Sequence, residues 1–150
     1  MSIDENVELA HRVIDTWNRG DYEAWIELFD EDCEFRPLRA QLERQAYRGH
    51  DGLRQFEQDL TEDWERVRFA LNEVREVGDQ VVLLARFHGR GRASGAEVDI
   101  PIGVVARVRE GKVAEARMFS DPDEALKAAE MREFDDGSEG DPGVPPVSLS

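Results

Sequence analysis

The chain has 150 residues, of which 34 are acidic and 19 are basic, so its formal net charge at pH 7 is -15. A chain of this length forms one domain and can bury a core without disulfide bonds or metal ions. The negative charge opposes binding to nucleic acids and to anionic membranes, because both surfaces carry phosphate groups. We therefore expect a soluble domain with neither of these partners.

The single cysteine, Cys33, excludes an internal disulfide bond and a zinc site built from several cysteines. It falls in a short apolar strand pattern, so we expect a buried structural thiol rather than a nucleophile. The N-terminus has no basic region followed by an apolar run, and no segment has the length of a membrane span. These features predict a cytoplasmic protein.

Residues 4–29 have the periodicity of two amphipathic helices. Gly20 is expected to end the first helix in the left-handed conformation, and Asp21 is expected to cap the second. The acidic run 30–32 is expected to form a turn that stops the second helix. Residues 33–36 alternate as a short strand.

Residues 38–48 fit no regular period, and we expect a loop there; loops of this length in compact domains are often functional. Asp51 is expected to cap a third helix. The side chains of that segment expected to face a sheet are Leu53, Phe56, Leu60 and Trp64.

Residues 67–119 are expected to form an antiparallel meander with turns at Gly78-Asp79, at 93–96 and at Glu110-Gly111. The alternation slips after Leu71, which predicts a bulge at Asn72 or Glu73. Pro101 predicts a sheet edge or a bulge, because proline cannot donate a ladder hydrogen bond.

A final helix is expected from Asp121 to about Met131, because Asp-Pro-Asp-Glu combines a cap, a first-turn proline and acidic residues. We expect one domain over residues 1–131 and a disordered acidic tail over 132–150. The predicted fold class is α+β, with a curved antiparallel sheet wrapped around three N-terminal helices.

Several short motifs in this order resemble the nuclear transport factor 2-like superfamily, and within it the SnoaL-like (polyketide cyclase-like) branch. They begin with Trp17-Asn18-Arg19-Gly20-Asp21 between the first two helices and 28–35 leading into the first strand. They continue with 47–53 at the third helix and Gly111-Lys112-Val113 at the last turn.

The resemblance implies a conical barrel around a mostly apolar cavity, and a homodimer formed through the outer face of the sheet. Members of the superfamily include isomerases, epoxide hydrolases, cyclases and proteins without activity, so the fold alone does not assign a reaction. Positions that hold the acid–base residues of the ketosteroid isomerases correspond here to Val13, Pro37 and Gly103. Positions of the Asp-Arg-Asp relay of the limonene epoxide hydrolases fall near Arg86-Phe87-His88 and Met118. Neither catalytic set is intact.

The strand 82–92 holds the most specific candidate for a catalytic site. Its basic residues Arg86, His88, Arg90 and Arg92 lie on one face, together with Val82 and Leu84. If that face is concave, Arg86 and His88 enter the pocket, where they can bind an anion and move a proton. Asp99 on the next strand is then a candidate base. If the face is convex, the same residues form salt bridges or a dimer contact, and this alternative is favoured by about two to one.

Aromatic side chains are numerous enough to line a cavity, with Trp17 and Tyr47 as the foremost candidates. The residues expected to bind a ligand are Trp17, Phe35, Tyr47, Phe56 and Met118. His11 and His50 are expected at the surface or in a turn, and together with His88 they have no metal-ligand spacing, so we expect no metal.

Two functions remain open from the sequence. The first is a pocket protein for an apolar or aromatic metabolite, which performs isomerisation, cyclisation or hydrolysis without a cofactor if it is an enzyme. The second is a non-catalytic binding or dimerisation module whose cavity is filled by its own side chains.

Overall fold

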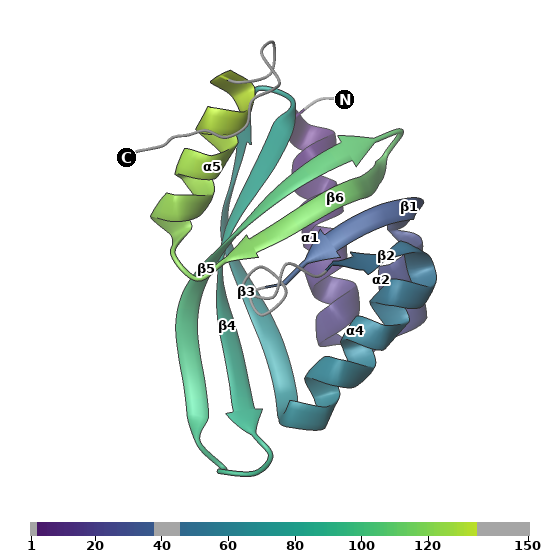
Figure 1. The fold of residues 1–150 in the computed structure, drawn as a ribbon, viewed down its shortest axis with the longest axis vertical. Helices are drawn as coiled ribbons and strands as arrows, with labels where there is room; N and C mark the ends of the chain where they lie inside the picture. Colours follow the sequence, from purple (N-terminus) through teal and green to yellow (C-terminus); the bar gives the residue numbers. More distant parts are fainter. Residues whose placement is uncertain (1–2, 38–45, 135–150) are drawn as a thin grey trace.

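The computed structural model describes residues 3–37 and 46–134. Within these residues, a curved sheet carries the helices α1, α2 and α4 on one face and α5 on the other (Figure 1). The elements, in chain order, are α1 (Ile3–Asn18), α2 (Tyr22–Glu27), β1 (Phe29–Arg36), β2 (Tyr47–Arg48), α4 (Gly49–Asp63), β3 (Trp64–Val77), β4 (Gln80–Gly91), β5 (Glu97–Arg109), β6 (Lys112–Phe119) and α5 (Pro122–Phe134).

The junction between α1 and α2 forms as predicted. Gly20 has a φ of +77°, and the Asp21 carboxylate accepts a hydrogen bond from the backbone N–H of Ala24 at 3.3 Å. Asn18 fastens this junction to the sheet, because its side-chain amide donates to the carbonyl of Phe69 at 2.8 Å and accepts from the N–H of Phe69 at 3.0 Å. An asparagine amide here takes the place of a neighbouring strand.

The sheet has six strands in the order β2-β1-β6-β5-β4-β3. It is curved but open, since β2 and β3 lie at opposite edges. The expectation of a wholly antiparallel sheet is wrong for one pair, because β1 runs parallel to β6. No hairpin joins these two strands, which are distant in the chain, so no tight turn fixes their relative direction.

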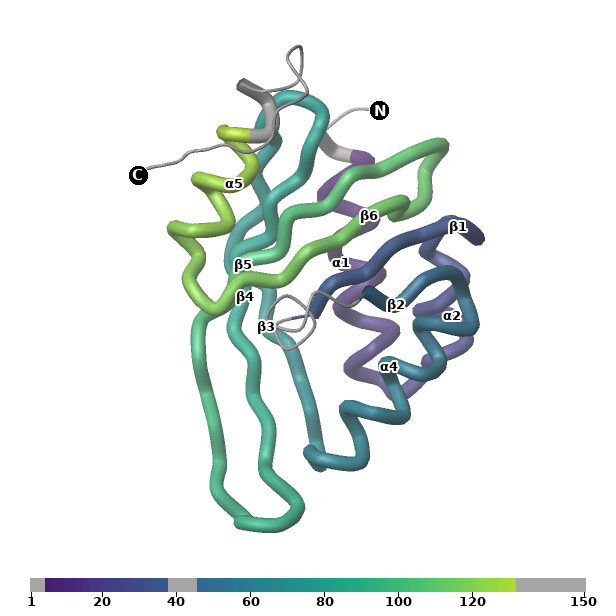
Figure 2. Tube along the Cα trace, in the orientation of Figure 1, coloured from purple at the N-terminus to yellow at the C-terminus, as the bar shows by residue number. Residues whose placement is uncertain are grey.

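Two irregularities in the long strands agree with the sequence. The register of β3 against β4 shifts between Leu71 and Glu73, which confirms the bulge at Asn72. Pro101 pairs with Arg86 on β4, whereas pairing of β5 with β6 begins only at Gly103, so Pro101 lies where β5 is an edge. The β4–β5 hairpin therefore extends beyond β6 (Figure 2), whereas β3 accompanies β4 as far as Gly91.

The start of α4 differs from the prediction. The helix begins at Gly49, and Arg48 precedes it without a side-chain cap, so Asp51 lies in the first turn and is not the N-cap. Tyr47 and Arg48 pair with Phe35 and Glu34 of β1, which places the end of the expected loop in a short strand. The rest of that loop, 38–45, lies outside the described residues.

The acidic run 30–32 also differs, because it belongs to β1, which begins directly after α2. The C-terminal α5 starts at Pro122 as expected and extends to Phe134. The predicted tail lies outside the described residues from 135 onward.

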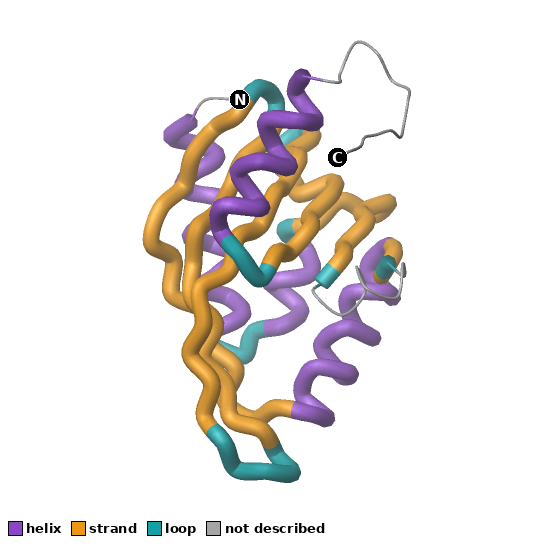
Figure 3. The backbone as a smooth tube through the Cα atoms, turned by 60° about the vertical axis from the view of Figure 1, so that its left-hand side comes forward, coloured by secondary structure: helices purple, strands orange, loops and turns teal. Residues whose placement is uncertain are grey.

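The two faces of the sheet have separate cores. Helices α1, α2 and α4 cover the concave face, whereas α5 lies across the opposite face (Figure 3). Ala125 and Ala129 of α5 pack on Val82 and Val105. Gly103 permits this close approach, because a Cβ there would lie 2.5 Å from the Cβ of Ala125.

Candidate functional site

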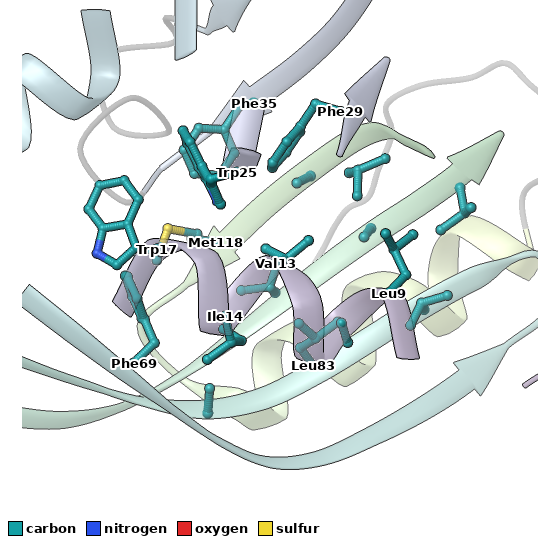
Figure 4. A pocket seen from close by; sticks show the side chains of 18 of the residues that line it. Leu9, Val13, Ile14, Trp17, Trp25, Phe29, Phe35, Phe69, Leu83 and Met118 are labelled. Carbon is teal, nitrogen blue, oxygen red and sulfur yellow. The ribbon is translucent and has the colours of Figure 1, made fainter. Parts of the chain in front are cut away.

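The concave face encloses an inner chamber of about 100 Å³ between α1, α2 and the sheet (Figure 4). Its lining is apolar except for Asn6 among the described residues, whose side-chain amide donates to the Glu76 carboxylate at 2.7 Å. Four of the predicted ligand-binding residues line this chamber, namely Trp17, Phe35, Phe56 and Met118. Val13, which takes the place of an isomerase tyrosine, is there as well.

A second cavity, of about 220 Å³, adjoins the inner chamber, and we call this second cavity the mouth. Phe56, Phe69 and Met118 line both cavities, so the two adjoin. The other residues of the mouth come from α4, β3, β4, β5 and the flanks of 38–45, and are Pro37, Tyr47, Asp59, Leu60, Asp63, Trp64, Phe87, Val98 and Ile100.

The polar groups of the site gather in the mouth. The Tyr47 hydroxyl donates to Oδ2 of Asp59 at 2.6 Å, and the Gln55 side-chain amide donates to Oδ1 of the same carboxylate at 2.8 Å. The distance of 2.6 Å is that of a hydrogen bond to a charged acceptor. Asp63 follows one helical turn after Asp59, so both carboxylates reach the same cavity.

Sequence reasoning placed Tyr47 in a pocket but missed Asp59 and Asp63. The sequence could have indicated both aspartates, because they recur at the same helical spacing as Phe56 and Leu60 in the apolar stripe of α4. Charged residues within such a stripe are unusual. Asp59 is half-buried, whereas Asp63, the last residue of α4, is exposed.

Aromatic rings form the far wall of the mouth. The rings of Trp64 and Phe87 lie 5.3 Å apart between centroids at 83°, and those of Phe69 and Phe87 lie 5.7 Å apart at 69°. Gly89 makes room for them, since a Cβ there would lie 2.9 Å from both the Trp64 and the Phe87 ring.

Arg86, His88 and Asp99 come together, but away from both cavities. The Nε of Arg86 donates to Oδ1 of Asp99 at 2.8 Å, and Nδ1 of His88 lies 3.5 Å from Oδ2 of Asp99. Their side chains are 41%, 44% and 51% exposed. Because Leu83 and Ala85 line the inner chamber and Phe87 lines the mouth, strand alternation turns Arg86 and His88 to the opposite face.

The sequence left two alternatives open for this face, and the placement agrees with the favoured one, in which the face that carries Arg86 and His88 is convex. Their assignment, with Asp99, as catalytic residues stays a prediction, and the geometry favours the alternative of a surface ion-pair cluster.

The remaining titratable candidates are structural. Burial raises the pKa of the Cys33 thiol to about 11, so the thiol stays protonated at neutral pH, and its side chain is buried as predicted. His50 lies in the first turn of α4 and not in a separate turn; its Nε2 lies 2.8 Å from the carbonyl of Phe29, and its side chain is half-buried. Among the described residues no group of three His, Cys, Asp or Glu side chains could hold a metal ion.

Comparison with known proteins identifies the family. Residues 10–116 match the SnoaL-like domain family, so the chain belongs to that family. A search of curated proteins found no match. Within the described residues, no helix combines the length and the apolar run needed to cross a membrane.

Solved structures share the fold. A protein assigned as a SnoaL-like polyketide cyclase from Jannaschia sp. CCS1 is 26% identical, with a TM-score of 0.68 over 85% of this chain and 92% of that chain. An NTF2-like protein of unknown function from Burkholderia pseudomallei is 18% identical, with a TM-score of 0.71 over 85% of this chain and 97% of that chain. A protein with a ketosteroid isomerase-like fold from Catenulispora acidiphila, in complex with trimethylamine, is 15% identical, with a TM-score of 0.67 over 75% of this chain and 84% of that chain.

Proposed function

We propose that this SnoaL-like protein binds an apolar or aromatic small molecule in the mouth of its cavity. The observation that carries the proposal is the combination of an aromatic wall with one hydrogen-bonded polar pair, Tyr47 and Asp59. Pockets for small molecules are typically lined by apolar and aromatic side chains with a few placed polar groups. The family and the similarity to the Jannaschia protein support a small-molecule ligand.

The same pair would carry acid–base chemistry without a cofactor, as isomerisation, cyclisation or hydrolysis. The carboxylate of Asp59 can accept a proton. The phenol oxygen of Tyr47, whose hydrogen is donated to Asp59, can accept a hydrogen bond from a ligand hydroxyl or amine and so orient the ligand. The inner chamber supplies no acid or base among its described lining residues, so we assign the chemistry to the mouth.

The alternative is a non-catalytic module, and one observation favours it. The inner chamber holds about 100 Å³ and the mouth about 220 Å³, and each is below the roughly 300 Å³ at which ligand pockets begin, so the protein's own side chains leave little room in either cavity. We also propose a cytoplasmic homodimer that uses the outer face of the sheet. Light scattering after size-exclusion chromatography tests the dimer, and a monomer mass would contradict it.

A fluorescence titration with N-phenyl-1-naphthylamine, an uncharged aromatic probe, tests the binding proposal. Ile100 lines the mouth, whereas the adjacent Asp99 lies on the opposite face of β5. We expect saturable binding to the native chain, its loss in Ile100→Trp, which fills the mouth, and its retention in the matched control Asp99→Trp. Absence of saturable binding to the native chain, or retention in Ile100→Trp with loss in Asp99→Trp, would contradict the proposal.

A further inference from the structure

The mouth combines aromatic rings with carboxylates, and this combination suits one class of ligand. We propose that the mouth selects ligands that carry a cationic amine or quaternary ammonium group beside an apolar body. This inference rests on the proposed function and names the substrate class of the same site.

The first support is the charge of the Asp59 carboxylate. Asp59 is half-buried, and its two side-chain oxygens accept from Tyr47 and Gln55, which are both uncharged donors. These hydrogen bonds hold the carboxylate in place without neutralising it. A cation in the mouth would complete an ion pair where solvent screening is weaker than at an open surface.

The second support is the balance of charge around the cavity. The described residues that line the mouth include Asp59 and Asp63 and no lysine, arginine or histidine. The basic side chains of β4 do not contribute, because Arg86 and Arg90 pair with acidic residues on the outer face. An anionic ligand would therefore meet the Asp59 carboxylate and a chain of net charge -15.

The third support is the wall of rings. Tyr47, Trp64, Phe69 and Phe87 all line the mouth, and a cation within about 6 Å of a ring centroid is attracted by the negative face of that ring. The neighbouring rings meet at steep angles, 83° and 69°, so they are not stacked face to face. An ammonium group in the mouth can thus contact this aromatic wall and the Asp59 carboxylate together.

Displacement of N-phenyl-1-naphthylamine by two probes of the same shape tests the inference. Benzyltrimethylammonium is the cationic probe, and neopentylbenzene is its uncharged carbon isostere. We expect the cation to bind at least about tenfold more tightly. Asp59→Asn should remove most of that difference while leaving the affinity for neopentylbenzene unchanged.

The matched control is Asp51→Asn, which removes the same charge from the same helix at a fully exposed position. It should preserve the preference for the cation, because the global charge change is identical. Equal or weaker binding of the cation by the native chain would overturn the inference, as would an equal effect of Asp59→Asn on both probes. In these cases the proposed function stands, because the neutral probe still binds; failure of every probe to bind would overturn both.

Discussion

The inner chamber and the mouth adjoin but have opposite chemistry. The inner chamber is lined by apolar side chains from α1, α2, α4 and five strands, and its single polar lining group among the described residues is Asn6. The mouth is larger and carries a tyrosine, two aspartates and a tryptophan. Under the proposed function, stability and ligand recognition are therefore separated: the inner chamber belongs to the core, and the mouth is the proposed binding site.

The largest expected effect comes from removing a buried ring that lines the inner chamber. Trp17 is 3% exposed and lies within 5.0 Å of the Trp25 ring between centroids. Trp17→Ala should lower the free energy of unfolding by about 3–5 kcal/mol, measured by guanidinium denaturation. Trp17→Phe is the control and should lose less. A loss below about 1 kcal/mol in Trp17→Ala would show that this region is not the core.

The next effect concerns the pH dependence of the free energy of unfolding that comes from the buried Cys33 thiol. The pKa of Cys33 is about 11 in the folded chain because the thiol is buried, against 9.0 when unfolded. The unfolded chain therefore loses this proton first, and the thiol's contribution to stability, complete below pH 9.0, falls as the pH rises through about 11. The native chain should lose roughly 2–3 kcal/mol relative to Cys33→Ala across this window. Parallel pH profiles of the two chains would contradict the burial of the thiol.

A smaller effect is expected in the mouth. Tyr47→Phe removes the donor to Asp59 and should cost about 1 kcal/mol in the free energy of unfolding. It should also leave the preference for benzyltrimethylammonium intact, because the carboxylate keeps its charge. Tyr22→Phe is the control, since the Tyr22 side chain lies outside the mouth. A loss of cation preference in Tyr47→Phe equal to that in Asp59→Asn would assign the selectivity to the phenol.

The smallest effect is expected on the outer face. Arg86→Ala breaks a half-exposed ion pair with Asp99, and such pairs contribute about 0.2–1 kcal/mol. Binding of N-phenyl-1-naphthylamine should be unchanged, and His88→Ala should behave in the same way. Loss of probe binding in both variants, with an unchanged free energy of unfolding, would show that the probe binds on the outer face.

The fold could be predicted from the sequence because its markers are local. Gly20 and Asp21 define the α1–α2 junction, and the slipped alternation locates the bulge at Asn72. The direction of β1 could not be predicted, since its pairing with β6 joins distant parts of the chain.

The face of β4 that lines the cavity could not be predicted for a physical reason. The alternation of residues shows which face of a strand points inward only when the other face is polar. Here α5 buries Val82 on one face of β4, while Val81 and Leu83 on the other face line the inner chamber. The strand is therefore apolar on both faces near its start, and the polar residues Arg86 and His88 follow on the face that α5 leaves uncovered.

The measurement that tests the central claim most directly is a crystal structure of the chain soaked with N-phenyl-1-naphthylamine. The account predicts electron density for the probe in the mouth, between Tyr47 and Trp64 and beside Ile100. Density for the probe on the outer face beside Arg86 and His88, with none in the mouth, would contradict it.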